Sequence, residues 1–203
     1  TYGPSVAITS ISNASPAVVT ATGHSLTDGD FVLVSSGWGG INNKVFRVAG
    51  VAAGTFTLED SDTTNINKYP AGGGDASDIK PITEWETVSQ ILSAESSGGD
   101  QNFTTFQFLE DDDERQYPTN KTAITLTLTV ADDPDMPYVK IVEDYDTEKK
   151  VAALLLTLPN KSVITYASIP SISATPSLAT NDIMSRTISL APQGRPLRFK
   201  PSV

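Results

Sequence analysis

Short segments rich in Val, Ile, Phe and Thr recur through the first third of the chain, and Gly, Asn, Asp or Pro closes each of them. β-branched and aromatic residues favour strands, whereas the closing residues favour turns. Short strands separated by frequent turns are typical of a small all-β barrel. We therefore predict strands over residues 6–11, 17–21, 31–35, 44–51 and 55–59.

Glycines and small polar residues interrupt this pattern over residues 69–78. Such a composition favours a flexible connection without regular structure. We place a domain boundary here. The prediction is a small β-barrel accessory domain over residues 1–76 and a second, β-sandwich domain over residues 77–203.

The clearest strand of the second domain covers residues 123–130, where apolar residues alternate strictly with threonines. A period of two is that of a half-exposed antiparallel strand. Residues 103–109 alternate in a similar way, so we expect them to form a long hairpin with this strand, joined by a loop over 110–120. The polar face of the strand carries Thr125, Thr127 and Thr129.

One segment has the spacing of an α-helix, with apolar residues at i, i+3, i+4 and i+7 between positions 138 and 145. Acidic residues and prolines just before it suit an N-cap and a first turn. The segment predicts a helix that lies on one face of a sheet. Its apolar residues are Tyr138, Ile141, Val142 and Tyr145, and its candidate caps are Asp133 or Asp135 with Pro134 or Pro137.

Further strands are predicted over residues 151–158, 162–169 and 183–190. The first of them is apolar at every position from 151 to 156, which favours a central or covered strand. The expected fold is therefore mainly β: a β-sandwich or curled sheet with one packed α-helix, plus the small N-terminal β-barrel.

Composition narrows the chemistry that the chain can perform. Its 203 residues include no Cys and one His, which excludes disulfides and thiolate metal sites and leaves little imidazole chemistry. With 24 acidic and 14 basic residues the net charge is −10, so the surface as a whole repels nucleic acid, whose binding depends on Lys and Arg. No apolar run approaches the roughly 18 residues of a membrane span, so we predict no membrane insertion.

The one histidine, His24, lies in a turn-like segment, and no G-x-S-x-G nucleophile motif accompanies it. We reject catalysis through it and predict no enzyme activity, no catalytic residue, no metal site and no cofactor. The densest charge is Glu110, Asp111, Asp112, Asp113 and Glu114, followed by Arg115.

This acidic run lacks the spacing and central Gly of an EF-hand, so a solvated hairpin loop is the default interpretation, with calcium binding as the alternative. Cationic residues gather near the C-terminus at Arg186, Arg195, Arg198 and Lys200. They either pair with the acidic run of a neighbouring copy or form a solubilising tail.

Residues 23–62 contain a Gly-His-x-Leu-x-x-Gly-Asp opening, an Asn-x-x-Phe-x-Val strand and a Thr-Phe-Thr-Leu closing strand. This arrangement resembles a small β-barrel module of bacteriophage tail and structural proteins. Gly29 and Asp30 turn the chain into a strand, while Phe46 and Phe56 supply the core. The matching positions are Gly23, His24, Leu26, Gly29, Asp30, Asn43, Phe46, Val48, Thr55, Phe56, Thr57 and Leu58.

From a strand region over 84–93 onward, the order of elements resembles the tail tube protein of long, non-contractile bacteriophage tails of the lambda type, here with an extra small β-barrel at the N-terminus. The most specific piece is the ending, with Arg186-Thr187 followed by Gly194-Arg195-Pro196. The resemblance implies a structural virion protein, assembled in the host cytoplasm, whose subunits form hexameric rings. The rings stack into a hollow tube around the tape-measure protein, starting from tail-tip initiator proteins, and DNA later passes through without specific binding.

The resemblance also suggests roles for residues. Thr125, Thr127 and Thr129 would face the lumen, residues Glu110 to Arg115 would stack rings, and Arg186, Arg195 and Arg198 would pair between subunits. The barrel would lie on the tube exterior. The alternative is a tail accessory module that binds host-surface carbohydrate, for which Trp38 and Tyr69 are the available aromatic residues in the first domain.

The distribution of charge along the chain fits a tube through which DNA passes. Residues after position 80 hold 10 basic and 17 acidic side chains, a net charge of −7, against −3 for the residues before. A wall without Lys and Arg would let DNA slide.

Overall fold

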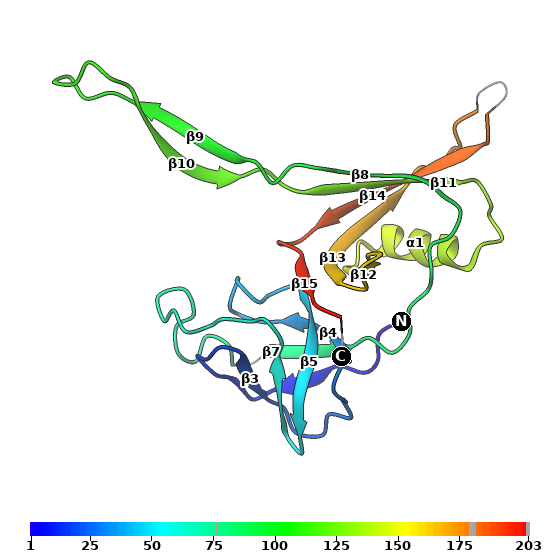
Figure 1. Cartoon of the computed structure of the whole chain (residues 1–203). Helices are drawn as coiled ribbons and strands as arrows, with labels where there is room; N and C mark the ends of the chain where they lie inside the picture. The colour runs from blue at the N-terminus through cyan, green and yellow to red at the C-terminus, as the bar shows by residue number, and fades with distance from the viewer. Residues whose placement is uncertain (76, 179–181, 202–203) are drawn as a thin grey trace. The chain divides into compact units, whose positions relative to one another are not determined.

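The computed structural model describes residues 1–75, 77–178 and 182–201. The fold is mainly β with one α-helix among these residues, which confirms the predicted class (Figure 1). The chain forms two compact units, and neither is continuous in sequence. The first comprises Thr1–Thr87, Glu148–Ile169 and Gln193–Val203, and the second comprises Val88–Thr147 and Pro170–Pro192.

The first unit contains a seven-stranded antiparallel sheet with the strand order β1-β7-β4-β5-β6-β3-β2. Its two edge strands, β1 and β2, are separated in sequence only by Thr9. The chain therefore passes directly from one edge of the sheet to the other, and the sheet is a nearly closed barrel. Its strands are β1 (Val6–Ile8), β2 (Ser10–Ile11), β3 (Ala17–Thr20), β4 (Phe31–Ser35), β5 (Lys44–Ala52), β6 (Thr55–Leu58) and β7 (Ser77–Pro81).

The predicted strand over 6–11 is thus two short strands. Val6 to Ile8 pair with β7, whereas Ser10 and Ile11 pair with β3. The exposed Thr9 between them donates its backbone N–H to the Thr20 carbonyl at 2.8 Å. A change of partner strand within one extended segment leaves no mark in the hydrophobic pattern.

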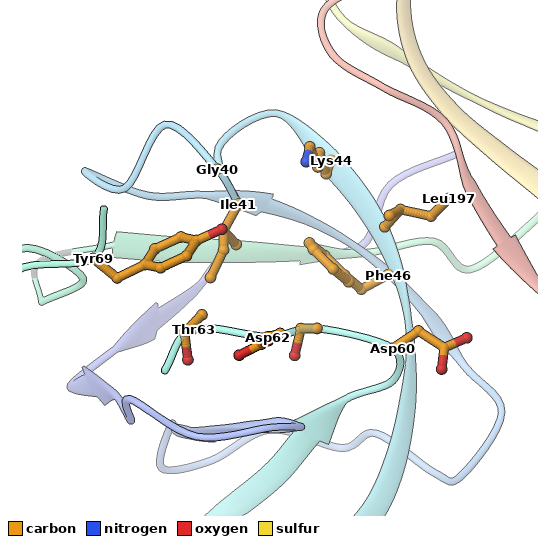
Figure 2. A pocket seen from close by; sticks show the side chains of 10 residues that line it. Gly40, Ile41, Lys44, Phe46, Asp60, Asp62, Thr63, Tyr69 and Leu197 are labelled. Carbon is orange, nitrogen blue, oxygen red and sulfur yellow. The ribbon is translucent and has the colours of Figure 1, made fainter. Parts of the chain in front are cut away.

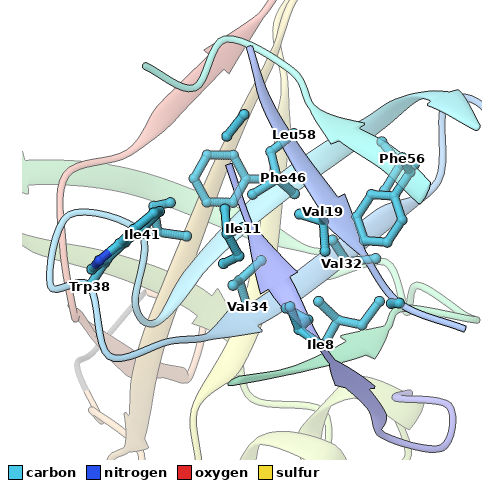
Figure 3. Packing of buried hydrophobic residues seen from close by; sticks show 14 of the residues in the cluster. Ile8, Ile11, Val19, Val32, Val34, Trp38, Ile41, Phe46, Phe56 and Leu58 are labelled. Carbon is cyan, nitrogen blue, oxygen red and sulfur yellow. The ribbon is translucent and has the colours of Figure 1, made fainter. Parts of the chain in front are cut away.

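Alternating residues of these strands fill the barrel with one apolar cluster (Figure 3). Burying a side chain of this size stabilises the fold by about 1.5–3 kcal/mol. The cluster is centred on residues that are almost inaccessible to solvent, among them Val19, Val32, Val34, Trp38, Ile41, Phe46, Phe56 and Leu58.

The described residues of the predicted flexible connection over 69–78 belong to the barrel unit, while Ala76 lies outside the described residues. Ser77–Pro81 forms β7, which pairs with both β1 and β4, and Ile79 is fully buried. Gly73 packs so closely on Trp38 that a Cβ at that position would lie 2.7 Å from the indole nitrogen. The glycines permit this contact, so they serve packing and not flexibility.

Three further strands belong wholly or partly to the first unit: β12 (Ala152–Thr157), β13 (Val163–Ile172) and β15 (Leu197–Phe199). β13 pairs antiparallel with β12 and with β15. β12 pairs only with β13 among the described strands, so the central position, one of the two predicted alternatives, is wrong. The other alternative, a covered strand, holds in part: Ala153 is partly buried, whereas Leu156 is exposed. The alternative of a solubilising tail is also wrong for β15, because Phe199 is fully buried.

In the second unit the central strand is β11 (Thr125–Ala131), which pairs antiparallel with β8 (Ile91–Ser97) and β14 (Ser185–Pro192). The predicted alternation of β11 is confirmed, because Leu126, Leu128 and Val130 are buried while the threonines are partly exposed.

The predicted helix is confirmed as α1 (Pro137–Glu148), with Pro137 in its first turn. The helix covers the apolar face of the sheet. Its Glu143 accepts a 3.0 Å hydrogen bond from Arg186 of β14, and Arg186 lies opposite the buried Val130 of β11. Tyr138 and Val139 are its buried residues, whereas Ile141 is 40% exposed. The buried stripe therefore differs from the predicted one.

The predicted hairpin between residues 103–109 and 123–130 is wrong. β9 (Gln101–Phe106) pairs instead with β10 (Arg115–Lys121), which lies inside the predicted loop. The sequence of β10 is polar, contains Pro118 and is exposed on both faces. Its strand is held by backbone pairing and not by burial, so the hydrophobic pattern gives no sign of it.

Candidate assembly surfaces

One face of the sheet in the second unit is lined with small polar side chains. The register places Thr127 between Glu95 on β8 and Ser189 on β14, and directly opposite residues share a face of a sheet. We call this surface the hydroxyl face. It consists of Ser93, Glu95, Ser97, Thr125, Thr127, Thr129, Thr187 and Ser189.

The hydroxyl face carries seven hydroxyl groups, one carboxylate and no Lys or Arg. All its residues on β8 and β14 are exposed, and the three threonines of β11 are partly exposed. The strand pairing thus extends the predicted threonine row over three strands. On β14, Thr187 and Ser189 alternate with the buried Ile188 and Leu190, so the sequence alone could have predicted that part of the hydroxyl face. Residues 93–97 of β8 are all small or polar, so no alternation in the sequence predicts their part of it.

A second surface is the β-ribbon of β9 and β10 with its connecting loop, residues 101–121, which we call the arm. In Figure 1 the arm extends as a separate two-stranded ribbon beyond β8 and β11. Every residue of the arm except Gln101 and Asp111 is exposed. Its large side chains nevertheless include Phe103, Phe106, Phe108, Leu109 and Tyr117.

The acidic run predicted to stack rings lies in the loop at the end of the arm. Arg115 begins β10, forms an ion pair with Asp111 and places its guanidinium 5.5 Å from the centre of the Phe108 ring. Phe108 packs edge-on against Phe106 at 5.3 Å. The loop is therefore organised around aromatic rings that sequence reasoning did not include in the site.

Two of the three arginines predicted to pair between subunits, Arg186 and Arg198, form hydrogen bonds within the chain. Arg186 donates to the Ser173 carbonyl at 2.9 Å and to Glu143. Arg198 donates to the Ser162 hydroxyl at 3.1 Å. Arg195 lies near enough to Lys44 to contribute to the lowered pKa of that amine, although burial is the larger cause.

A small cavity of about 120 Å³ opens beside Lys44 and is lined by Asp60, Asp62 and Tyr69 among others (Figure 2). Hydrogen bonds from Thr64 lower the pKa of Asp62. Pockets for small-molecule ligands usually measure about 300–1,000 Å³, so this hollow is too small for such a role. Within the described residues, no group of three or more His, Cys, Asp or Glu side chains is placed to hold a metal ion.

The aromatic residues proposed for carbohydrate binding are not available for it. Trp38 and Tyr69 are both buried and pack edge-on against each other at 5.3 Å. The Trp38 indole N–H donates to the Pro70 carbonyl at 2.9 Å. The expectation of a Trp38 and Tyr69 sugar platform is therefore wrong, because both rings belong to the barrel core.

The side chain of His24 packs against the core of the barrel. Its ring packs edge-on against the buried Phe56 at 5.3 Å, and neither ring nitrogen has a hydrogen-bond partner among the described residues. No described helix is long and apolar enough to cross a membrane.

The described surfaces of this β-rich chain are wide polar and aromatic faces of antiparallel strands, which suit contacts between macromolecules. The sequence model of the phage tail tube protein (TTP) family matches residues 36–201. The chain therefore belongs to the phage tail tube protein family, is a structural component of the virion tail and is not an enzyme. A comparison with curated proteins gave no match.

The family match confirms the resemblance of the sequence to tail tube proteins. It begins at Ser36, directly after β4, and so includes β5, β6 and β7 of the barrel. The matched region is thus not confined to residues 77–203.

Proposed function

We propose that copies of this chain form hexameric rings that stack into the hollow tube of a long, non-contractile phage tail, with the hydroxyl face lining the lumen. The observation that carries this proposal is the composition of that face. Passing DNA would meet hydroxyl groups, whose hydrogen bonds water readily replaces. Lys and Arg side chains would instead displace counterions and hold each phosphate.

Ring closure is proposed to use a free strand edge. β8 pairs only with β11 among the described strands, and all its side chains are exposed. An unpaired edge readily adds a strand from another chain, and a ring of paired edges leaves none free to aggregate. In this proposal a neighbouring subunit pairs with β8, which extends the hydroxyl face around the lumen.

The arm is proposed to stack one ring on the next through its loop, residues Glu110 to Arg115. Arg195 and Arg198 are candidates for contacts between subunits, whereas Arg186 would first have to leave Glu143. Residues 1–76 are proposed to form an accessory domain on the tube exterior and residues 77–203 the tube-forming part. The tape-measure protein inside the tube and the tail-tip initiator are the proposed further partners.

The test combines assembly with DNA retention. The wild-type protein should form hollow tubes with sixfold symmetry in electron micrographs, and these tubes should retain no short duplex DNA. Thr127→Lys should still form tubes, because the side chain is partly exposed, but those tubes should retain DNA at low salt and release it at high salt.

Thr22→Lys, at an exposed site of the barrel, is the matched control and adds the same charge away from the hydroxyl face. Thr127→Lys tubes that retain no more DNA than Thr22→Lys tubes would contradict a lumen position. Failure of the wild type to form tubes under any condition would contradict the ring-stacking proposal as a whole.

A further inference from the structure

The small cavity of the first unit brings three basic side chains together. Lys44 begins β5, is partly buried and lines the cavity (Figure 2). Lys68 places its ammonium 5.3 Å from the centre of the Tyr69 ring, which lines the same cavity. The segment before β15 also passes close by, since a Cβ at Gly194 would lie 3.4 Å from the Lys44 Cε, and Arg195 follows directly. Three segments that are distant in sequence thus converge on one amine.

We call Lys44, Lys68 and Arg195 the cationic triad. None of the three forms an ion pair within the described part of the chain. Burial lowers the pKa of the Lys44 amine below its ordinary value, and the charges of Lys68 and Arg195 lower it further. At a given pH more of this amine is therefore neutral, and hence nucleophilic, than of an exposed lysine.

Asp60 and Asp62 line the cavity as well but do not neutralise the triad. Both aspartates are exposed, and neither forms an ion pair among the described residues. The Asp62 carboxylate instead accepts hydrogen bonds from the backbone N–H and the hydroxyl of Thr64, at 3.0 and 2.7 Å. Three cations against two carboxylates that water screens leave a positive site, which attracts a further negative charge close to Lys44.

The volume of the cavity limits the group that can approach the amine. The cavity measures about 120 Å³, whereas a water molecule in the liquid takes up about 30 Å³. Ligands of ordinary size do not fit, but the three heavy atoms of carbon dioxide do. Carbon dioxide also reacts with an amine to give an anion, which is the charge that the triad lacks.

We propose that Lys44 is a carbon dioxide site, at which the amine is converted reversibly into a carbamate. The lone pair of the neutral amine attacks the carbon atom, the N–C bond forms, one C=O electron pair moves onto oxygen, and the nitrogen releases a proton to water. The Lys44 side chain then carries two anionic oxygens, for which Lys68 and Arg195 supply the cations. The carbamate ties the segment before β15 to the barrel. It forms on the free subunit and does not depend on tube assembly.

The first test locates the modification on the wild-type protein, which is equilibrated with isotope-labelled bicarbonate and carbon dioxide. Triethyloxonium ion then converts a carbamate into a stable ethyl ester, whose position peptide mass spectrometry determines. We expect the label on Lys44 and none on Lys140, whose side chain is 82% exposed and pairs with Asp144. Absence of label from Lys44, or equal label on the two lysines, would overturn the proposal.

A stability measurement separates the carbamate from a bicarbonate ion that binds without reacting. The urea unfolding midpoint of the wild type should rise when carbon dioxide is added at constant pH and ionic strength. Lys44→Arg keeps the positive charge but forms no carbamate, because the guanidinium stays protonated, so its midpoint should not move. An equal rise in both proteins would indicate ordinary anion binding and would contradict the carbamate.

A third measurement tests the partner of the carbamate. With carbon dioxide below saturation, Arg195→Gln should lower the labelled fraction of Lys44 about two- to fivefold, the range for the loss of one exposed ion pair. Arg198→Gln is the matched control, because it removes the same charge from an arginine that binds Ser162, and it should leave the labelled fraction unchanged. Equal labelling of the two variants would be evidence against a carbamate beside Arg195.

Discussion

The barrel and the arm are both antiparallel β-structure, yet they are stabilised in different ways. The barrel encloses an apolar cluster whose central side chains are almost inaccessible to solvent. The arm exposes its aromatic rings on both faces and encloses nothing. The comparison teaches that large apolar residues in one chain need not all stabilise its fold: those of the barrel are buried in its core, whereas those of the arm are exposed and are available for the contacts between subunits proposed above.

The largest expected effect tests the barrel core. Phe56→Ala should lower the free energy of unfolding by about 3–5 kcal/mol, because the ring is fully buried and leaves a cavity. Urea denaturation followed by tryptophan fluorescence measures this change. Val18→Ala, at a position of β3 that is 36% exposed, is the control and should change stability by no more than about 0.5 kcal/mol. Similar losses in the two variants would remove the basis of the comparison.

A charged pair in each region gives a second, smaller contrast. Arg47 is buried, donates to Glu59 and to the Lys200 carbonyl, and has a raised pKa because of the Glu59 hydrogen bonds. Arg47→Met should cost about 2 kcal/mol in urea unfolding, since hydrogen bonds between charged groups of this kind are lost. Arg115→Met in the arm, whose pair with Asp111 is exposed, should cost less than about 0.5 kcal/mol. An equal loss in the free energy of unfolding for the two variants would be evidence against this difference between the barrel and the arm.

The body of the second unit, as distinct from its arm, has a core with one flaw. The Tyr138 hydroxyl is buried and has no hydrogen-bond partner among the described residues. Tyr138→Phe should therefore raise the free energy of unfolding by about 1 kcal/mol. Tyr138→Ala, which removes the ring, should lower it by about 3 kcal/mol or more. A loss of stability in the Phe variant would show that the hydroxyl is satisfied in solution.

The same residue predicts a pH effect. Burial raises the pKa of Tyr138 above the ordinary tyrosine value of 10.0. Above that pH the unfolded chain releases a proton that the folded chain keeps, so stability falls as pH rises. Tyr138→Phe should make this fall shallower in urea titrations between neutral and alkaline pH. Part of the fall in stability should remain in this variant, because burial also raises the pKa of Tyr166. An unchanged slope would contradict the assignment to Tyr138.

The smallest effect is expected in the arm. Phe103→Ala in the free subunit should change the free energy of unfolding by less than about 0.5 kcal/mol, because the ring is already more than half exposed. The measurement is again urea denaturation, beside Phe56→Ala. A loss above about 1.5 kcal/mol would mean that the arm is folded onto the subunit in solution.

Prediction from sequence succeeded where burial sets the pattern. The strict alternation of Leu126, Leu128 and Val130 with threonines identified β11, because one face of that strand is buried and the other is not. Helical spacing with Pro137 in the first turn identified α1. In β11 the local pattern and the tertiary contacts agree, whereas in α1 the pattern predicted the helix but not the residues that it buries.

It failed where backbone pairing or close packing decides the structure. Every residue of β10 is exposed, so this strand, the true partner of β9, is invisible in the hydrophobic pattern. Gly73 and Gly74 led to the prediction of a flexible segment. Their close contact with Trp38 joins residues far apart in sequence, so no local pattern reveals it. The hydroxyl face was predicted for one strand alone, since the register that adds β8 and β14 is a long-range property.

The course of the chain has a consequence for synthesis. The first unit needs β15, where Phe199 is fully buried and Arg47 binds the Lys200 carbonyl, although its barrel strands are complete by Pro81. The ribosome therefore makes the barrel strands first and β15 only after both segments of the second unit, between which it makes the segment Glu148–Ile169 of the first unit. A nascent chain that has not passed Lys200 lacks this last piece. The first unit can therefore be completed only after β15 has been synthesised. Because the arm precedes β15 in the chain, the arm has already been made by then.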